Sequence, residues 1–351
     1  MKKRVEHIDL IRVFACLSVI AIHINAITRD NFITNNKTYY ALFTLLDSFT
    51  RAGVPLFLML TGYFVLKKEE DYKTFIKKKM PKLIIPFILF SFVYYLYLVY
   101  DTNISFNILS FIKRLFNNEI YYHLWYMYTI ILIYLFIPYE KVLVDNLKQK
   151  DLLRLIITTF IIGNLFLTIN LLTKRYNHPF LSACLLPNLI IYNNYVLLGH
   201  YLSKYDFKNK KLIYILGLIS VLFMPIVDLF FIDGNVRNDV MLTATSILPV
   251  FYTLGIYYLI KDNYDKLKIN KKVKKLIENY SRLSLYIYLS HVLVMNITVK
   301  ILSSYWIYDR FVENILFTII VFIITAIVSY FISIIFDLLY NKIENRIKRK
   351  A

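Results

Sequence analysis

The sequence predicts an all-α integral membrane protein, a bundle of about ten transmembrane helices with both termini in the cytoplasm. Hydrophobic residues make up 58% of the 351-residue chain, and the mean hydropathy of +0.54 is too high for a soluble domain with a polar surface. The apolar residues form runs of about 20, the length that crosses a bilayer as a helix. The basic residues are dense in every second loop between these runs, as membrane topology requires.

Ten runs are long enough to span. The first follows MKKRVEH and resembles a signal peptide, but it has the length of a spanning helix and no small-residue cleavage site, so we expect it to be retained. The second is interrupted by Gly53 and Pro55. No linker-like tract, charge block or repeat divides the chain, so residues 1–351 form one domain. The expected spans are 8–28, 42–66, 83–100, 123–139, 152–173, 187–203, 212–232, 241–260, 283–304 and 315–340.

The charge distribution predicts the orientation of the bundle. Of the 42 Lys and Arg residues, 30 lie at the two termini and in the loops 67–82, 141–151, 204–211 and 261–282. The alternate loops hold only eight, so the first set faces the cytoplasm. The net charge of +19 therefore reports topology, and no basic face remains for binding nucleic acid. The two cysteines, Cys16 and Cys184, lie near opposite membrane faces, and we expect neither a disulfide nor a metal site.

The first run, with the sequence IRVFACLSVIAIHI over 11–24, contains Arg12 and His23. An arginine at the bilayer centre costs about 2.5–3.5 kcal/mol on insertion scales, so its presence needs a reason. Eleven residues at 100° each place Arg12 and His23 on one helix face, about 16 Å apart along the axis, with Cys16 between them. A snorkelling anchor explains Arg12 alone, and an interhelical hydrogen bond explains His23 alone. Together they favour a site that extends from the cytoplasmic headgroups past the membrane centre.

The second run adds Asp47 and Arg51, four residues apart. A structural ion pair is the simplest interpretation. Because this helix runs from outside to inside, Asp47 also reaches the depth of His23 and could orient its imidazole. The Thr61-Gly62 pair near the inner end allows close approach of another backbone or of a ligand.

Two further histidines are candidates. His123 stands beside Trp125 and Tyr126 at the outer end of the fourth run, where the three side chains form either a sugar-stacking platform or an interfacial aromatic belt. His291 lies about eight residues into a helix that runs from inside to outside. It could meet the groove of Arg12, or it could bond a neighbouring helix.

At these residues the chain resembles the acyltransferase family 3 membrane proteins. The family has an arginine, ten arbitrary residues and a histidine in its first span, which correspond to Arg12 and His23. RAGVPLFLMLTGYF, KKKMPKLIIPFILFSFVYY, HLWYMYTIILIYLFIP and SRLSLYIYLSHVLVM resemble further family segments in the right order. One departure is Val292, where the family often has proline after the histidine.

The resemblance implies transfer of an acyl group, usually acetyl, from cytoplasmic acyl-CoA to a hydroxyl of a cell-surface carbohydrate. A CoA phosphate needs a cation at the cytoplasmic end, and a hydroxyl acceptor needs a general base further out. His23 would be the base, oriented by Asp47, and both direct transfer and an acyl-histidine relay stay open. The expected donor-side residues are Arg12, Arg51, Lys82 and His291, and the expected acceptor-side residues are His123, Trp125 and Tyr126.

The resemblance also sets the expected partners. They are acetyl-CoA or another acyl-CoA as donor, an extracytoplasmic carbohydrate acceptor, the lipid bilayer and either polysaccharide-synthesis machinery or a second copy of the chain. The Lys-, Asn- and Ile-rich composition suggests a bacterial plasma membrane. Two other classes stay open: a transporter of a polysaccharide or small polar molecule, and a structural member of a polysaccharide-synthesis complex. A transporter often shows paired broken helices, and only one broken run is evident.

Overall fold

The computed structural model describes residues 5–30, 32, 36–67, 70–174, 188–230, 239–303 and 311–350. Within them the chain is helical, and eight helices or helix pairs are long and apolar enough to cross a membrane. Two more of the expected spans overlap the 17-residue helices α9 (Asn188–Lys204) and α11 (Ile247–Asn263). The all-helical membrane fold is confirmed, whereas the count of ten spans and the side of each terminus stay predictions.

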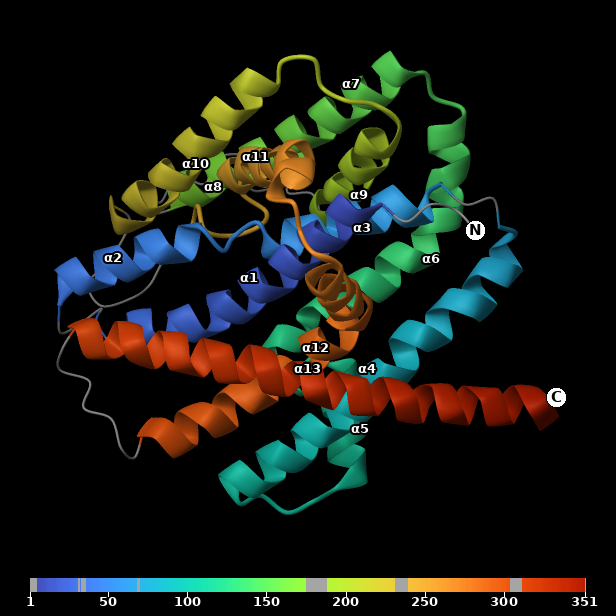
Figure 1. Cartoon of the computed structure of the whole chain (residues 1–351), viewed down its shortest axis with the longest axis vertical. Helices are drawn as coiled ribbons and strands as arrows, with labels where there is room; N and C mark the ends of the chain where they lie inside the picture. Colours follow the sequence, from blue (N-terminus) through green and yellow to red (C-terminus); the bar gives the residue numbers. More distant parts are fainter. Residues whose placement is uncertain are drawn as a thin grey trace.

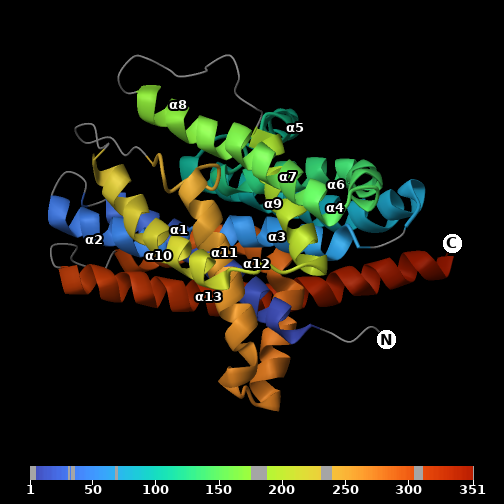
Figure 2. The same ribbon diagram turned by 90° about the horizontal axis from the view of Figure 1, so that it is seen from above.

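Helix α1 (Glu6–Asp30) lies at the centre of the bundle against α3, α12 and α13 (Figure 1). The start of α1 and the end of α13 lie toward the same side of the molecule, which Figure 2 also shows. A hairpin made by the end of α11 and the start of α12 projects from the bundle in Figure 2. The helices are α1, α2 (Lys37–Ser48), α3 (Gly53–Val65), α4 (Tyr72–Thr102), α5 (Ile108–Phe116), α6 (Trp125–Asp145), α7 (Gln149–Phe160), α8 (Phe166–Lys174), α9, α10 (Lys210–Phe230), α11, α12 (Lys271–Ser303) and α13 (Phe311–Lys350), with short turns η1 (Tyr122–Leu124), η2 (Ile161–Leu165) and η4 (Tyr264–Leu267).

The second span is broken, as the sequence predicts. Helix α2 ends at Ser48, and α3 begins at Gly53 after a four-residue turn. Pro55 falls in the first turn of α3, where a missing backbone N–H leaves no helical hydrogen bond unmade. The break redirects the chain, so that α2 and α3 pack on different parts of α1.

Helices α3 and α9 are in unusually close contact. A Cβ atom built on Gly62 would lie 1.8 Å from the Val196 carbonyl oxygen, and one on Gly199 would lie 1.8 Å from that of Met59. No side chain fits at either position. Small residues that let helix backbones approach are typical of membrane bundles, and the close approach predicted at Gly62 is confirmed.

One expected span is wrong in part. The sequence predicts a helix over 241–260, but α11 begins only at Ile247, and residues 239–246 form an irregular buried segment. The carboxylate of Asp228 accepts the backbone N–H groups of Met241 at 2.7 Å and Leu242 at 3.0 Å. Buried non-helical backbone is tolerated in a membrane protein only when its polar groups find such partners. Hydropathy alone does not show this arrangement.

Candidate functional site

Three imidazole rings from distant parts of the chain meet in the bundle. His23 comes from α1, His123 from the turn η1 and His291 from α12. Their ring centroids are 5.3 Å apart for His23 and His291, 5.4 Å for His123 and His291, and 6.3 Å for His23 and His123. We call this group the imidazole cluster. In the part of the chain that the structure describes, no group of His, Cys, Asp and Glu is arranged to hold a metal ion.

Local backbone structure explains why the rings converge. Tyr121 is extended, and η1 then turns the chain into α6, which places His123 inside the bundle instead of on its surface. His291 lies in the most buried stretch of α12, one turn after Tyr288. His23 occupies a face of α1 that packs toward both elements and is partly exposed.

Tyrosine rings enclose the cluster. The ring of Tyr94 lies 4.9 Å from that of His123, and the ring of Tyr122 lies 5.3 Å from that of His23. Tyr122 is 56% exposed, so the cluster reaches the molecular surface beside His23. His123 and His291 are fully buried. The cluster is therefore shielded on the inside and open at one edge.

Hydrogen bonds fix the protonation pattern of His291. Its Nδ1 lies 2.5 Å from the carbonyl oxygen of Tyr288, which can only accept, so Nδ1 carries the proton and Nε2 has the lone pair. The Tyr288 hydroxyl donates to the carbonyl oxygen of His123. Among the described residues, His291 Nε2 and both ring nitrogens of His123 are buried without a hydrogen-bond partner. Buried nitrogens of this kind are suited to proton transfer with a reacting group.

A cavity of about 980 Å³ opens near the start of α1 and ends close to the cluster. Four basic side chains and two acidic ones line it, and tyrosines, apolar side chains, Thr61, Ser281 and Ser284 form the remaining wall. The guanidinium of Arg12 stacks over the Phe64 ring at 5.1 Å, and the Lys67 ammonium lies over the Tyr63 ring at 4.3 Å. The charged lining residues are Arg12, Lys67, Lys79, Arg282, Asp9 and Glu278.

The cavity stops at Tyr126 and Tyr288, whose rings meet edge to face at 5.3 Å. The Tyr288 ring is 5.7 Å from the rings of both His123 and His291. One layer of tyrosine therefore separates the cavity from the imidazole cluster. His23 does not line the cavity.

The cavity does not follow the face of α1 that carries Cys16 between Arg12 and His23. Cys16 is 1% exposed and does not line the cavity, which instead follows α3, α4, α6 and α12 from Arg12 onward. Of the expected donor-side residues, Arg12 lines the cavity, whereas Lys82 is exposed and does not line it. Lys79, one turn earlier on α4, takes the position expected for Lys82. His291 belongs to the cluster rather than to the cavity wall.

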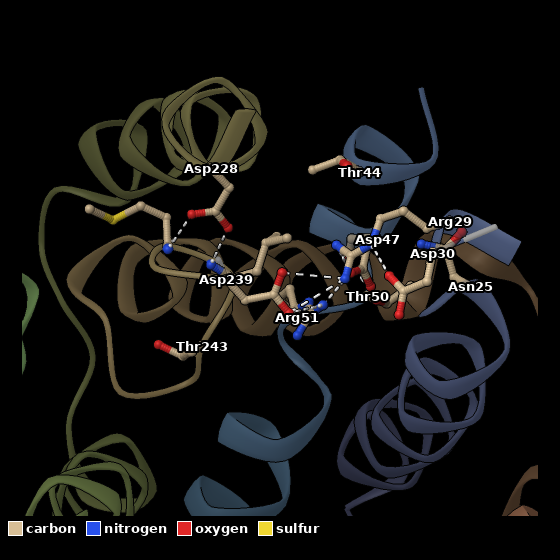
Figure 3. Close-up of polar contacts among 12 residues, drawn as sticks. Asn25, Arg29, Asp30, Thr44, Asp47, Thr50, Arg51, Asp228, Asp239 and Thr243 are labelled. Carbon is tan, nitrogen blue, oxygen red and sulfur yellow. Dashed lines mark hydrogen bonds and ion pairs between the residues drawn. The ribbon is translucent and has the colours of Figure 1, made fainter. Parts of the chain in front are cut away.

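Asp47 and Arg51 belong to a separate ion network, which Figure 3 shows. Asp47 is fully buried and accepts from Arg29 at 2.8 Å and from Arg51. Arg29 also donates to Asp239 at 3.3 Å, and Arg51 lies 4.0 Å from Asp239. The structure therefore places Asp47 beside Arg29, on another face of α1 from His23. Arg51 joins the same network and does not line the cavity.

The three residues predicted to bind the acceptor lie in three different places. His123 is buried in the cluster, Tyr126 ends the cavity, and Trp125 packs on Tyr192 at 5.2 Å. Sequence reasoning missed Tyr288, although its place one turn before His291 puts both side chains on one face of α12. Arg29 follows the last residue of the expected first span, 8–28, yet it lies within α1 and is 0% exposed.

Comparison with known proteins identifies the family of the chain. The family model described as an acyltransferase domain matches residues 5–334, nearly the whole chain. No curated protein and no solved structure matches the chain. The chain therefore belongs to acyltransferase family 3 and is a multi-pass membrane protein of the acyltransferase class.

Proposed function

We propose that the protein transfers an acyl group, most simply acetyl, from cytoplasmic acyl-CoA to a hydroxyl of a cell-surface carbohydrate on the other side of the membrane. One observation carries the proposal: a cavity with four basic side chains ends one tyrosine layer from three clustered imidazoles. Basic side chains suited to binding phosphate thus lie next to imidazoles suited to acid–base chemistry. The location that fits this reaction is a bacterial plasma membrane.

The cavity suits the donor. Arg12, Lys67, Lys79 and Arg282 supply four positive charges against two from Asp9 and Glu278. Arg282 is also paired with Asp337 at 2.5 Å, and the lining stays net positive, which favours an anionic ligand. Arginine grips phosphate through paired N–H groups, so Arg12 is the strongest candidate for the CoA phosphates. The apolar and tyrosine wall beyond them suits the uncharged pantetheine arm.

The cluster suits the chemistry. A base, either His23 or His291 Nε2, takes the proton of the acceptor hydroxyl while its oxygen attacks the thioester carbonyl carbon. The carbon–sulfur bond then breaks, and the sulfur takes up the proton as free CoA thiol. In a relay, an imidazole nitrogen of His23 first attacks the thioester carbonyl carbon, the carbon–sulfur bond breaks and CoA leaves as the thiolate. The acceptor hydroxyl then attacks the acyl-imidazole, the carbon–nitrogen bond breaks, and the hydroxyl proton passes to the thiolate. Either route needs the Tyr126 and Tyr288 rings to part or the thioester to reach between them.

The test uses purified protein in nanodiscs with acetyl-CoA labelled on the acetyl group. We expect saturable binding and slow release of labelled acetate or transfer to added carbohydrate. His23→Ala and His291→Ala should abolish turnover and keep binding, whereas Arg12→Ala should chiefly weaken binding. If folded wild-type protein neither binds nor turns over acetyl-CoA, the proposal is wrong.

A transporter is the second candidate, and one observation favours it. The break between α2 and α3 and the irregular segment 239–246 approach each other at Arg51 and Asp239. Paired non-helical segments are typical of substrate sites in transporters. Sealed vesicles separate the two functions: a transporter would move a carbohydrate without acetyl-CoA, and an acyltransferase would consume acetyl-CoA.

A further inference from the structure

Helix α5, with the sequence ILSFIKRLF, has two chemically distinct sides. At 100° per residue, Ile108, Leu109, Ile112 and Phe116 fall within an arc of about 100°. Ser110, Lys113 and Arg114 lie outside this arc, at about 140° to 240° from Ile108. Such a strict division in a nine-residue helix is typical of helices that lie along a boundary between water and an apolar phase.

The apolar side of α5 is not covered by the bundle. Leu109 is 71% exposed and Phe116 is 82% exposed, and Ile108 and Ile112 are exposed as well. Within α5, which is described throughout, Phe111 is the one buried residue. Removing a side chain of this size from water gains about 1.5–3 kcal/mol. Four such side chains on one helix therefore need an apolar surrounding.

The structure holds α5 firmly in place. The Asn107 side chain caps the helix by accepting from the backbone N–H of Leu109 at 2.8 Å. The Tyr95 hydroxyl donates to the Asn107 carbonyl oxygen at 2.8 Å, and the Tyr128 hydroxyl donates to the Leu115 carbonyl oxygen. Both ends of α5 are thus bonded to spanning helices, α4 and α6. Figure 1 shows α5 at the edge of the molecule beside α4.

The exposed apolar surface of α5 continues that of a spanning helix. Helix α4 exposes large apolar side chains at intervals of three or four residues, so they form one stripe that faces lipid. The stripe reaches the end of α4 and passes through the next loop onto α5. Its members are Ile85, Leu89, Val93, Leu96, Tyr100, Ile104 and Phe106.

From this placement we propose that α5 is an interfacial helix, embedded in the leaflet at the C-terminal end of α4. Its four exposed apolar side chains lie among acyl chains, and Lys113 and Arg114 face the phosphates of the headgroups. A basic residue near an anionic lipid surface gains about 1 kcal/mol. This inference does not depend on the proposed acyl transfer.

The proposal sets the depth of the imidazole cluster. Tyr95 bonds α5, and its neighbour Tyr94 packs on His123 at 4.9 Å. The two contacts arise at one level of α4, so the cluster lies near the headgroup region. An acceptor hydroxyl would then meet the cluster at the membrane surface, close to Tyr122.

Spin labelling in nanodiscs of phosphatidylcholine and phosphatidylglycerol tests the proposal. Labels go at Leu109→Cys, Ile112→Cys and Phe116→Cys, with Ser110→Cys and Lys113→Cys as matched controls from the other side. Cys184→Ser removes one native thiol, and the buried Cys16 is inaccessible to the reagent. We measure collision with oxygen, which concentrates in lipid, and with a water-soluble nickel chelate.

We expect the first three labels to favour oxygen over the chelate at least severalfold and the two controls to show the reverse. Equal access of the chelate to both sets would place α5 in water and overturn the proposal. Shielding of positions 109, 112 and 116 from both reagents would also overturn it, because a protein surface would then cover the helix.

Discussion

Lys79 and Lys82 are one helical turn apart on α4 and differ in their contact with the cavity. Both lie on the basic entry to α4, but only Lys79 lines the cavity. We predict that Lys79→Ala weakens acetyl-CoA binding by about tenfold, the loss expected when one charge-assisted contact of about 1.4 kcal/mol is removed. Lys82→Ala is the matched control and should bind like wild type. Isothermal titration of the nanodisc protein measures both, and equal affinities for the two variants would remove Lys79 from the site.

Tyr288 joins the cavity to the imidazole cluster through its ring, its hydroxyl and its carbonyl. Tyr288→Phe keeps the ring and removes the hydroxyl that bonds the His123 carbonyl. Loss of a hydrogen bond worth about 1 kcal/mol should lower kcat by about fivefold and leave the KM for acetyl-CoA unchanged. Tyr126→Phe, in the same tyrosine layer, is the comparison. A higher KM with unchanged kcat would show that Tyr288 only forms the cavity wall.

The buried pair of Arg29 and Asp47 should matter for stability more than for catalysis. Asp47→Asn leaves the fully buried Arg29 guanidinium without its closest carboxylate, and removing one partner of a buried pair costs about 3–5 kcal/mol. Asp151→Asn breaks the exposed pair with Arg154 and should cost less than about 1 kcal/mol. Thermal unfolding in detergent compares them, and similar midpoints for the two variants would contradict the structural role of Asp47.

At the scale of elements, the α3–α9 contact is the most sensitive packing in the described bundle. Gly62→Ala or Gly199→Ala would place a methyl group 1.8 Å from a backbone oxygen, so the helices must separate. Such overpacking costs about 1–3 kcal/mol and occasionally more. Gly217→Ala on α10 meets its nearest atom at 3.2 Å and should be milder. Melting temperatures would show this order, and an unaffected Gly62→Ala would mean that α3 and α9 are further apart.

The helices themselves follow largely from the sequence, because a bilayer leaves few alternatives to runs of apolar residues. The break at Gly53 and Pro55 can also be predicted from the residues at that point of the chain. The irregular segment 239–246 cannot, because the carboxylate that accepts its backbone N–H groups belongs to Asp228 on the preceding helix. Likewise, the spacing of Arg12 and His23 on α1 is read from one helix, but the course of the cavity depends on which neighbours pack beside it.

Most features of the site that the sequence does not predict depend on how one helix packs against another. The sequence relates Asp47 to His23 by depth alone, and depth does not say which face of α1 meets α2. The position of His123 before α6 predicts a place at the surface, yet the turn η1 carries it inward. These errors concern rotation about helix axes, a quantity that hydropathy does not contain.

For the whole molecule, the loop charges predict a definite orientation. Lys272→Cys on the projecting hairpin and Lys113→Cys on α5 should react with an impermeant thiol reagent from opposite sides of sealed vesicles. The hairpin should react from the side that held the cytoplasm. Reaction of both positions from one side would contradict the orientation and, with it, the direction of acyl transfer.

The buried irregular stretch at 239–246 has a consequence for biogenesis. A translocon releases one segment at a time into lipid, and this stretch cannot enter alone because its amides need Asp228 and its aspartate needs Arg29. It can settle only after α1 and α10 have been inserted and have met. The first and seventh of the expected spans must therefore be in place before the eighth is finished, so this part of the bundle is completed by helices that lie far apart in the sequence.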